Sequence, residues 1–144
     1  MSVQLTELTL QDALEVGRNL RASDRAEALG VFPSLQAWAE DRVSLRGLAW
    51  CLKAEGRPVF AIGVATIGDI GMMWLACCDG WERYVKHSLR VLRAITRAKV
   101  YKALAMECSA DDPVAQSFAE RLGFVKRGEA GRIVNYGMDL CSGS

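Results

Sequence analysis

The sequence predicts a single α/β domain, spanning residues 1–144, in which helices flank a mixed β-sheet. A length of 144 residues is usual for one domain. Apolar residues make up 51% of the chain and charged residues 24%, so the chain can bury a core and is not intrinsically disordered. Segments with strand-like and helical periodicity alternate along the chain, which is typical of a sheet covered by helices.

Charge and cysteine content argue against several classes of protein. The net charge of +1 gives no electrostatic attraction to nucleic acid. The five cysteines are odd in number, include no Cys-x-x-Cys pair and follow no recognisable signal peptide, so we expect reduced thiols in a cytoplasmic protein. The single histidine and the lack of a ligand-spaced cluster argue against a metal site, and no apolar run is long enough for a membrane span.

The N-terminal third is predicted to form one strand and three helices. Residues 3–8 alternate between apolar and polar side chains, as a strand does. Thr9 is expected to cap the first helix and Ser34 the third. Ser23 is expected to cap a shorter second helix that stops at Gly30. The first helix has one apolar stripe, formed by Leu10, Ala13, Leu14, Gly17 and Leu20. The third is expected to bury Leu35, Trp38 and Ala39.

The middle of the chain is predicted to form three strands and then a long helix. Residues 47–54 and 59–67 flank a Glu-Gly-Arg-Pro turn and should pair as a hairpin. Residues 72–78 follow as a buried strand, which Gly80 ends. Residues 81–98 are predicted to form one continuous helix. Its inward face is expected to hold Val85, Ser88, Leu89, Leu92, Ile95 and Thr96.

The next strand, residues 102–108, should run parallel to residues 72–78, because a helix connects them through a right-handed crossover. Two further strands are expected to complete the sheet. One starts at Phe124, and the other covers residues 132–140.

The helix between these strands has strong signals at both ends. Asp112 is suited to cap it, and Pro113 fits its first position, where a backbone N–H would have no partner. Gly123 is suited to end it in the left-handed conformation. Its apolar face consists of Ala115, Phe118, Ala119 and Leu122.

This order of elements resembles the GNAT acyltransferase fold, whose mixed sheet is split into a V. The run MECSADDPVAQSFAERLGF, residues 106–124, is similar to a later conserved region of that family, in which Asn-x-x-Ala follows a strand and a helix ends in Leu-Gly-Phe. Asp112 stands at the Asn position, Ala115 at the Ala position and Gly123–Phe124 at the end. The resemblance covers about residues 70–140.

The N-terminal part is similar to a phage family of GNAT-like proteins that includes the internal virion protein A type of short-tailed phages. Its shared features are an Arg-x-x-Asp-x-x-Glu stretch, the outline of a Gly-x-Pro turn and a Trp-Leu strand end. They correspond to Arg21, Asp24 and Glu27, to Gly56–Pro58, and to Trp74–Leu75. This resemblance implies a place in the host cytoplasm or the virion, with virion or host proteins as partners.

The GNAT resemblance implies an acetyl-CoA site at the start of the long helix. Active members bind the cofactor pyrophosphate there through Arg/Gln-x-x-Gly-x-Gly/Ala. Arg83 is retained and Ser88 is small, but Lys86 replaces the first glycine and would crowd a loop that needs positive φ. Two interpretations stay open. Arg83 and Lys86 bind phosphate through their charges, with His87 as a further contact, or the segment is an ordinary helix start with exposed bases. Asp112, at the Asn position, is a further candidate for cofactor binding.

The catalytic groups that the resemblance implies are incomplete. Many members place a tyrosine at the position of Ala119 to protonate the leaving thiolate, and alanine cannot donate a proton. Cys108 and Ser109 are weak substitutes, and Cys108 is otherwise a small buried hydrophobe. Glu107 is the first candidate for the general base and Asp79 the second. The alternatives are a solvent-facing edge residue for Glu107 and a turn residue for Asp79.

The tryptophans are interpreted mainly as core residues. Trp81 differs because it follows Cys78–Gly80 at the mouth of the cleft that the resemblance implies. It either occupies the place of a pantetheine arm or staples the start of the helix.

Three functions remain open from the sequence. The first is a phage-type GNAT-fold protein with a degenerate acyl-CoA site and a virion-associated or host-interacting role, which Lys86 and Ala119 favour. The second is a divergent enzyme that transfers acetyl from acetyl-CoA to a small amine, which Arg83 and the Leu-Gly-Phe helix end favour. The third is a purely structural assembly module. The two motif losses place non-enzymatic roles ahead of catalysis.

Overall fold

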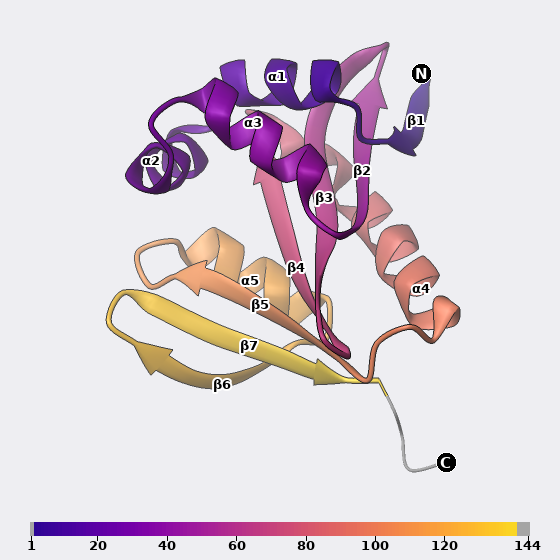
Figure 1. Ribbon diagram of the computed structural model, residues 1–144, viewed down its shortest axis with the longest axis vertical. Coiled ribbons are helices and arrows are strands. Elements are labelled where there is room, and N and C mark those ends of the chain that lie inside the picture. The colour runs from indigo at the N-terminus through magenta and orange to yellow at the C-terminus, as the bar shows by residue number, and fades with distance from the viewer. Residues whose placement is uncertain (1, 141–144) are drawn as a thin grey trace. The chain divides into compact units, whose positions relative to one another are not determined.

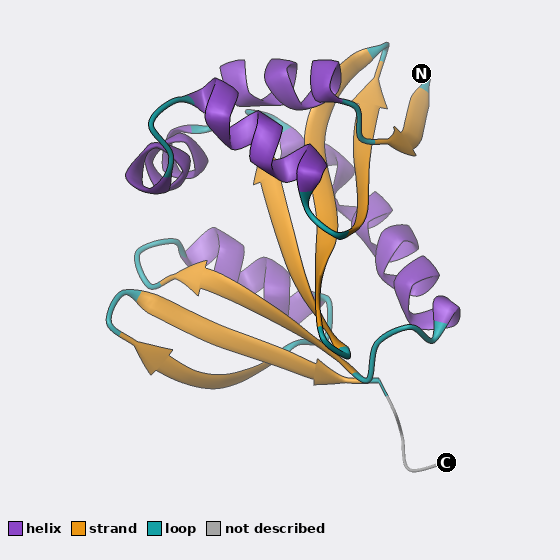
Figure 2. Ribbon diagram, in the orientation of Figure 1, coloured by secondary structure: helices purple, strands orange, loops and turns teal. Residues whose placement is uncertain are grey.

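Seven strands form one mixed sheet in the order β1-β2-β3-β4-β5-β7-β6 in the computed structural model, which describes residues 2–140 (Figure 1). The strands are β1 (Val3–Glu7), β2 (Gly47–Ala54), β3 (Arg57–Ile67), β4 (Ile70–Cys77), β5 (Ala103–Ser109), β6 (Val125–Ala130) and β7 (Ile133–Asp139). The helices are α1 (Leu10–Arg18), α2 (Ala22–Val31), α3 (Leu35–Ser44), the 3-10 helix η1 (Trp81–His87), α4 (Ser88–Ala98) and α5 (Pro113–Arg121). This order confirms the predicted α/β fold (Figure 2).

The described residues fall into two compact units. One lies within Met1–Gly63 and Leu75–Lys86, and the other within Val64–Trp74 and His87–Ser144. Strands β3 and β4 each contribute residues to both units, so the same sheet runs through both.

In the first unit, β1 and β2 pair antiparallel, and α1 packs on α3. Gly17 lies against Trp38, and a Cβ there would lie 3.4 Å from the ring, which is ordinary van der Waals contact. Thr9 and Ser34 cap α1 and α3 as predicted, through side-chain oxygens that accept from the amides of residues 12 and 37. Leu10, predicted on the buried stripe of α1, is 43% exposed.

The predicted cap of α2 is wrong. The helix begins after Arg21, and Ser23 lies inside its first turn. Leu20 forms a β-bridge with Cys78, and the Arg21 amide donates to the Cys77 carbonyl at 2.8 Å. These tertiary contacts hold Arg21 extended and set the start of the helix, so the local capping preference of Ser23 is overridden.

In the second unit, β4 and β5 pair in parallel, as predicted, with Ile70–Met73 in register with Ala103–Met106. Strand β7 pairs antiparallel with β5 and β6. Helix α5 also agrees with the prediction. Its Asp112 cap accepts from the Ala115 amide at 3.2 Å, and Gly123 after the helix has a φ of +100°.

The long helix predicted over residues 81–98 is wrong in its first seven residues, which form η1 rather than α-helix. A 3-10 helix has three residues per turn instead of 3.6, so the positions that face the core differ from those predicted for an α-helix. Leu89, predicted inward, is 36% exposed, whereas Val91 is buried.

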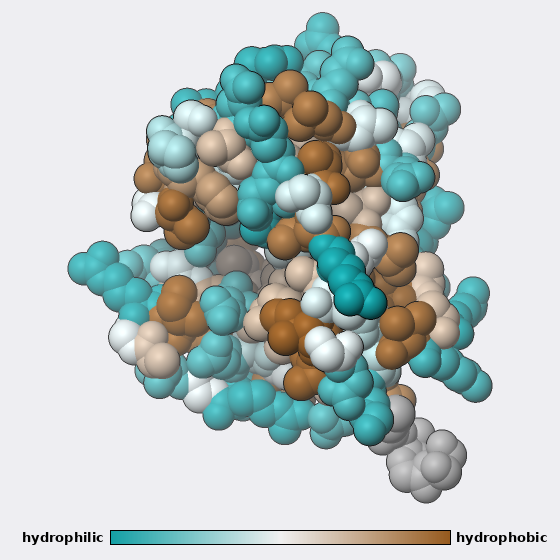
Figure 3. Space-filling model, viewed as in Figure 1, coloured by the Kyte–Doolittle hydropathy of each residue, from teal (hydrophilic) through white to brown (hydrophobic). Residues whose placement is uncertain are grey.

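None of the helices in the described part is long and apolar enough to cross a membrane. Figure 3 shows apolar and hydrophilic side chains mixed on the face that it draws. Several apolar side chains of the described residues are well exposed, including Val31, Ile67, Val100 and Val125.

We expect Gly71→Ala to destabilise the protein by about 1–3 kcal/mol through overpacking. A Cβ at Gly71 would lie 2.5 Å from Val64, 2.9 Å from Leu104 and 3.0 Å from Tyr101, and all three side chains are buried. Urea unfolding measures the change. Gly128→Ala is the matched control, because a Cβ there meets nothing within 4 Å. Equal midpoints for the two variants would contradict this packing.

Candidate functional site

The segment that follows β4 carries most of the predicted cofactor residues. Asp79 and Gly80 form a turn, and the φ of +86° at Gly80 is one that glycine adopts without strain. The Trp81 amide donates to the Cys78 carbonyl at 3.2 Å, which closes the turn. Asp79 is exposed in this turn, so its interpretation as a turn residue agrees with its placement.

Two of the three edges of η1 differ in their exposure to solvent. Side chains three residues apart lie on the same edge of a 3-10 helix. Trp81, Tyr84 and His87 share an edge and are buried or half-buried, whereas Arg83 and Lys86 share another edge and are exposed. These two cations lie about 6 Å apart along the axis, from a rise of ~2.0 Å per residue. The fold therefore presents a pair of positive charges on one edge.

Lys86 fits this backbone without strain. Among the described non-glycine residues, positive φ occurs only at Glu55 and Lys99, so Lys86 is not in the conformation that would require glycine. In a 3-10 helix each amide donates to the carbonyl three residues earlier, so the amides of residues 84–87 are occupied within η1, and those of Trp81 and Arg83 donate to the Cys78 and Gly80 carbonyls. The exposed side chains of Arg83 and Lys86 are the charged groups that this segment offers to a phosphate.

Helix α4 starts directly after η1, with His87 as its cap residue in a helical conformation. Ser88 is its first residue and is fully buried, and its hydroxyl has no hydrogen-bond partner within residues 2–140. A buried unpaired hydroxyl costs about 1–3 kcal/mol. Because Ser88 has no exposed surface, a ligand does not reach this hydroxyl in the described conformation.

Trp81 is 2% exposed, and the guanidinium carbon of Arg21 lies 5.7 Å from the centre of its ring. This placement favours its interpretation as an anchor for the helix start. The contact joins residues sixty positions apart in the sequence, so no local pattern could predict it.

Glu107 lies on an exposed face of β5. Its neighbours Met106 and Cys108 are buried, so the alternation of the strand turns Glu107 away from the core. It is in register with Asn135 of β7. The Glu107 carboxylate is therefore accessible from solvent.

Asp112 is 8% exposed and its carboxylate caps α5. The side chain of Gln116 supports the same helix start by donating to the carbonyls of Ser109 and Ala110. The part of Asp112 in cofactor binding stays a prediction.

Of the two weak substitutes for a proton donor, Cys108 is buried and Ser109 is half-buried. Ala119 is fully buried, and the Cys108 thiol donates to the Ala115 carbonyl at 3.6 Å, so Cys108 behaves as a small core residue. Burial is the main cause that raises the pKa of Cys51 to about 12 and that of Cys78 to about 11, and it also raises the pKa of Cys77. These thiols are therefore poor nucleophiles. No group of residues suited to hold a metal ion occurs in the described part of the chain.

Tyr136 on β7 is a buried residue that no sequence motif marks. It donates to a Glu120 carboxylate oxygen at 2.9 Å. Burial first, and then this hydrogen bond, raise the pKa of Tyr136 to about 12. Tyr136 is therefore a weaker acid than an ordinary tyrosine and is a poor substitute for the tyrosine missing at Ala119.

Comparison with known proteins supports the fold. The sequence matches no protein-family model and no curated protein. The structure is similar to the PaiA N-acetyltransferase from Thermoplasma acidophilum in complex with coenzyme A, with a TM-score of 0.75, 16% identity, and coverage of 96% of this chain and 99% of that one. It is also similar to the GNAT domain of S. lividans PAT, with a TM-score of 0.78, 12% identity, and coverage of 95% and 89%.

A third similar structure is RimL, a ribosomal L7/L12 α-N-protein acetyltransferase in complex with coenzyme A. Its TM-score is 0.74, with 8% identity and coverage of 96% of this chain and 94% of that one. The fold is therefore that of the GNAT acetyltransferases. The resemblance to phage GNAT-like proteins stays a prediction, because these matches are to acetyltransferases.

We expect the stability of the protein to fall between pH 10 and pH 12, partly through Tyr136. The folded pKa of about 12 lies above the usual tyrosine value of about 10. The neutral hydroxyl therefore stabilises the fold fully below pH 10, and this contribution is lost as the pH rises through 12. Tyr136→Phe should cost about 1–2 kcal/mol at pH 8 and should reduce the alkaline loss.

Urea unfolding at a series of pH values measures both effects. Glu120→Gln is the companion variant, because it keeps a hydrogen-bond acceptor and removes the charge. An alkaline loss in Tyr136→Phe as large as in the wild type would contradict the role assigned to this hydroxyl.

Proposed function

We propose that this protein is a divergent N-acetyltransferase that uses acetyl-CoA and binds the cofactor phosphates through side-chain charges. The observation that carries the proposal is the exposed edge of η1, where Arg83 and Lys86 stack one turn apart just before α4. Two cations at the positive end of a helix suit a pyrophosphate. The similarity to acetyltransferases solved with coenzyme A supports an acyl-CoA ligand.

Arg83 and Lys86 would hold the phosphates, whereas the predicted part of Ser88 would require its fully buried hydroxyl to become accessible. Arg83 brings several donors in a planar arrangement, and Lys86 brings a compact charge. Acetyl-CoA, when bound, supplies an activated acetyl thioester. His87 lies at the junction of η1 and α4, and its predicted phosphate contact belongs to the same proposal.

Glu107 is the general base of this proposal. Its exposed carboxylate on β5 would take a proton from an acceptor ammonium, directly or through a water molecule, and would attract a cationic amine. Asp79 stays the second candidate. Ala119 offers no proton to the departing thiolate, so solvent must supply it. A well-placed general acid contributes about 10²–10⁴-fold, so we expect a slow enzyme.

Isothermal titration with acetyl-CoA tests the cofactor site. We expect micromolar binding by the wild type and about tenfold weaker binding by Arg83→Ala and by Lys86→Ala, from the loss of one charged contact each. Arg97→Ala is the matched control, because Arg97 is an exposed base in the last turn of α4. No heat and no thermal shift with millimolar acetyl-CoA would rule out the proposal.

Lys86→Gly separates two modes of phosphate binding. It restores the glycine of the family motif and removes a charge. If side-chain charges bind the phosphates, this variant binds acetyl-CoA more weakly than the wild type. Tighter binding would mean that backbone amides are the phosphate ligands and that η1 unwinds on binding.

A second candidate function is a non-catalytic role, which the fully buried Ala119 favours. The predicted phage-type protein, with virion or host partners, belongs to this alternative. Acetyl transfer to a panel of small amines distinguishes the two functions. Turnover that falls at least about tenfold in Glu107→Gln supports the enzyme. Acetyl-CoA binding without turnover supports the non-catalytic role.

A further inference from the structure

Asp24 on α2 forms a buried ion pair with Arg21. One carboxylate oxygen lies 2.9 Å from the Arg21 guanidinium, and the Asp24 side chain is 8% exposed. The two residues are three positions apart at the start of α2. Burial strengthens the attraction between the two charges, but removing them from water costs desolvation energy. Because these two effects largely offset each other, a contribution to stability alone does not explain why the pair is present.

The same two residues bind the end of β4 through the backbone amide and the backbone carbonyl of Cys77. The other Asp24 oxygen accepts from the Cys77 amide at 2.8 Å, and the Arg21 amide donates to the Cys77 carbonyl at 2.8 Å. The bridge between Leu20 and Cys78 continues this pairing by one residue. The strand end is therefore fixed in position by the start of α2.

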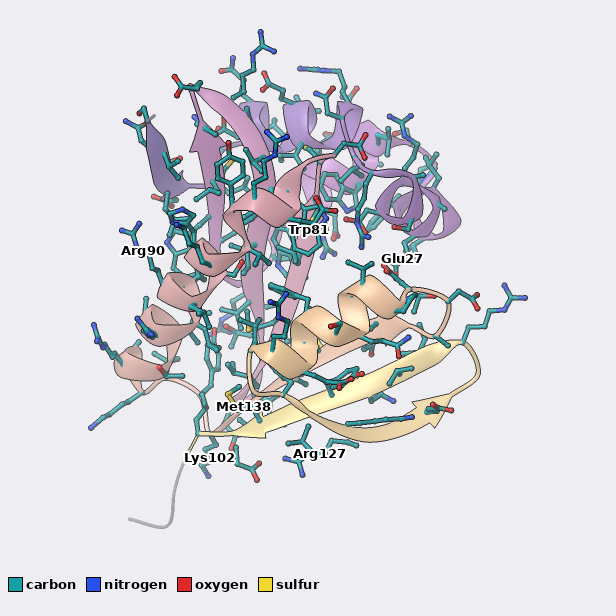
Figure 4. The ribbon with its side chains drawn as sticks, turned by 180° about the vertical axis from the view of Figure 1, so that it is seen from behind. Glu27, Trp81, Arg90, Lys102, Arg127 and Met138 are labelled. Carbon is teal, nitrogen blue, oxygen red and sulfur yellow. The ribbon has the colours of Figure 1, made fainter. Side chains whose placement is uncertain are left out.

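Arg21 also reaches the far side of the turn, where its guanidinium lies over the ring of Trp81. Trp81 is the first residue of η1 (Figure 4). Cys77 and Trp81 are thus anchored on either side of the Asp79–Gly80 turn. We call Arg21 and Asp24, with these two contacts, the α2 clamp.

The orientation of Trp81 determines the direction of the phosphate-binding pair. Successive residues of a 3-10 helix are separated by one third of a turn, so a helix with one edge buried has its other edges fixed. With Trp81 buried, Arg83 and Lys86 must point outward. If the Trp81 side chain were packed less firmly, η1 could rotate or unwind, and the charges of Arg83 and Lys86 would move apart.

We propose that Arg21 and Asp24 are positioning residues, which hold Arg83 and Lys86 in the orientation that binds the acyl-CoA phosphates. This inference rests on the proposed function. It assigns a role to residues that the sequence marks only by resemblance, and that lie on a different element from the ligand-binding charges.

Two measurements on Asp24→Ala test the α2 clamp. Amide hydrogen exchange reports the local structure, and isothermal titration with acetyl-CoA reports the site. We expect the Cys77 amide to exchange at least about tenfold faster, with little change at Leu52, a buried residue of β2 that reports the stability of the unit. We expect the Kd for acetyl-CoA to rise by about tenfold or more, since small displacements of binding groups have large effects.

Asp12→Ala is the matched control. Asp12 forms an ion pair with Lys53 at 3.1 Å in the same unit, and its side chain is 13% exposed. This variant should leave both the Cys77 exchange rate and the Kd within about twofold of the wild type. Asp24→Asn keeps an acceptor for the Cys77 amide and should restore part of the protection. If Asp24→Ala does not fold, Asp24→Asn and Arg21→Lys provide the same comparison.

The inference is overturned if the Cys77 amide in folded Asp24→Ala is as protected as in the wild type, or if its exchange accelerates while the Kd is unchanged. A wild-type protein that binds no acetyl-CoA has a different meaning. That result overturns the proposed function, and with it the positioning role of the α2 clamp. This holds even if the Cys77 amide exchanges faster in Asp24→Ala.

Discussion

The way β4 ends is the constraint on which the candidate site depends. Both backbone groups of Cys77 bond to the start of α2, through the Asp24 carboxylate and the Arg21 amide. The chain then has two residues, Asp79 and Gly80, in which to turn before Trp81 is buried. Because contacts fix both ends of this turn, they determine the orientation of η1 and therefore that of its charged residues. Exposure of Arg83 and Lys86 follows from the burial of Trp81, without any contact of their own.

This constraint also explains how the fold tolerates Lys86 at a position where the motif that the sequence resembles has glycine. A glycine is needed where the backbone takes positive φ or where amides must approach a ligand closely. The φ of Lys86 is not positive, and the amides of residues 84–87 donate within the 3-10 helix. In the proposed binding mode, the charges of Arg83 and Lys86 take the place of amide donors. The absence of a tyrosine at Ala119 has no such compensation, since the nearby buried hydroxyl of Tyr136 is bonded to Glu120 and is a weak acid.

Sequence patterns predicted the elements whose signals are local and missed those that depend on distant contacts. Helix α5 was predictable because Asp112, Pro113 and Gly123 each act within their own turn. The start of α2 was not, since the bridge between Leu20 and Cys78 overrides the cap at Ser23. Helical periodicity indicated α4 but not η1, because 3-10 and α-helical patterns differ little over seven residues. Of the candidate site, the positions of Arg83, Lys86 and Glu107 came from resemblance, and the role of Arg21 and Asp24 required the structure.

In the proposed binding mode, side-chain charges on an intact η1, rather than backbone amides, bind the acyl-CoA phosphates. A crystal structure of the protein with acetyl-CoA distinguishes these two modes. We expect the pyrophosphate against Arg83 and Lys86, with residues 81–87 still in a 3-10 helix and Trp81 still buried beneath Arg21. A complex in which η1 has unwound and its amides hold the phosphates, or in which acetyl-CoA lies away from this segment, would contradict it.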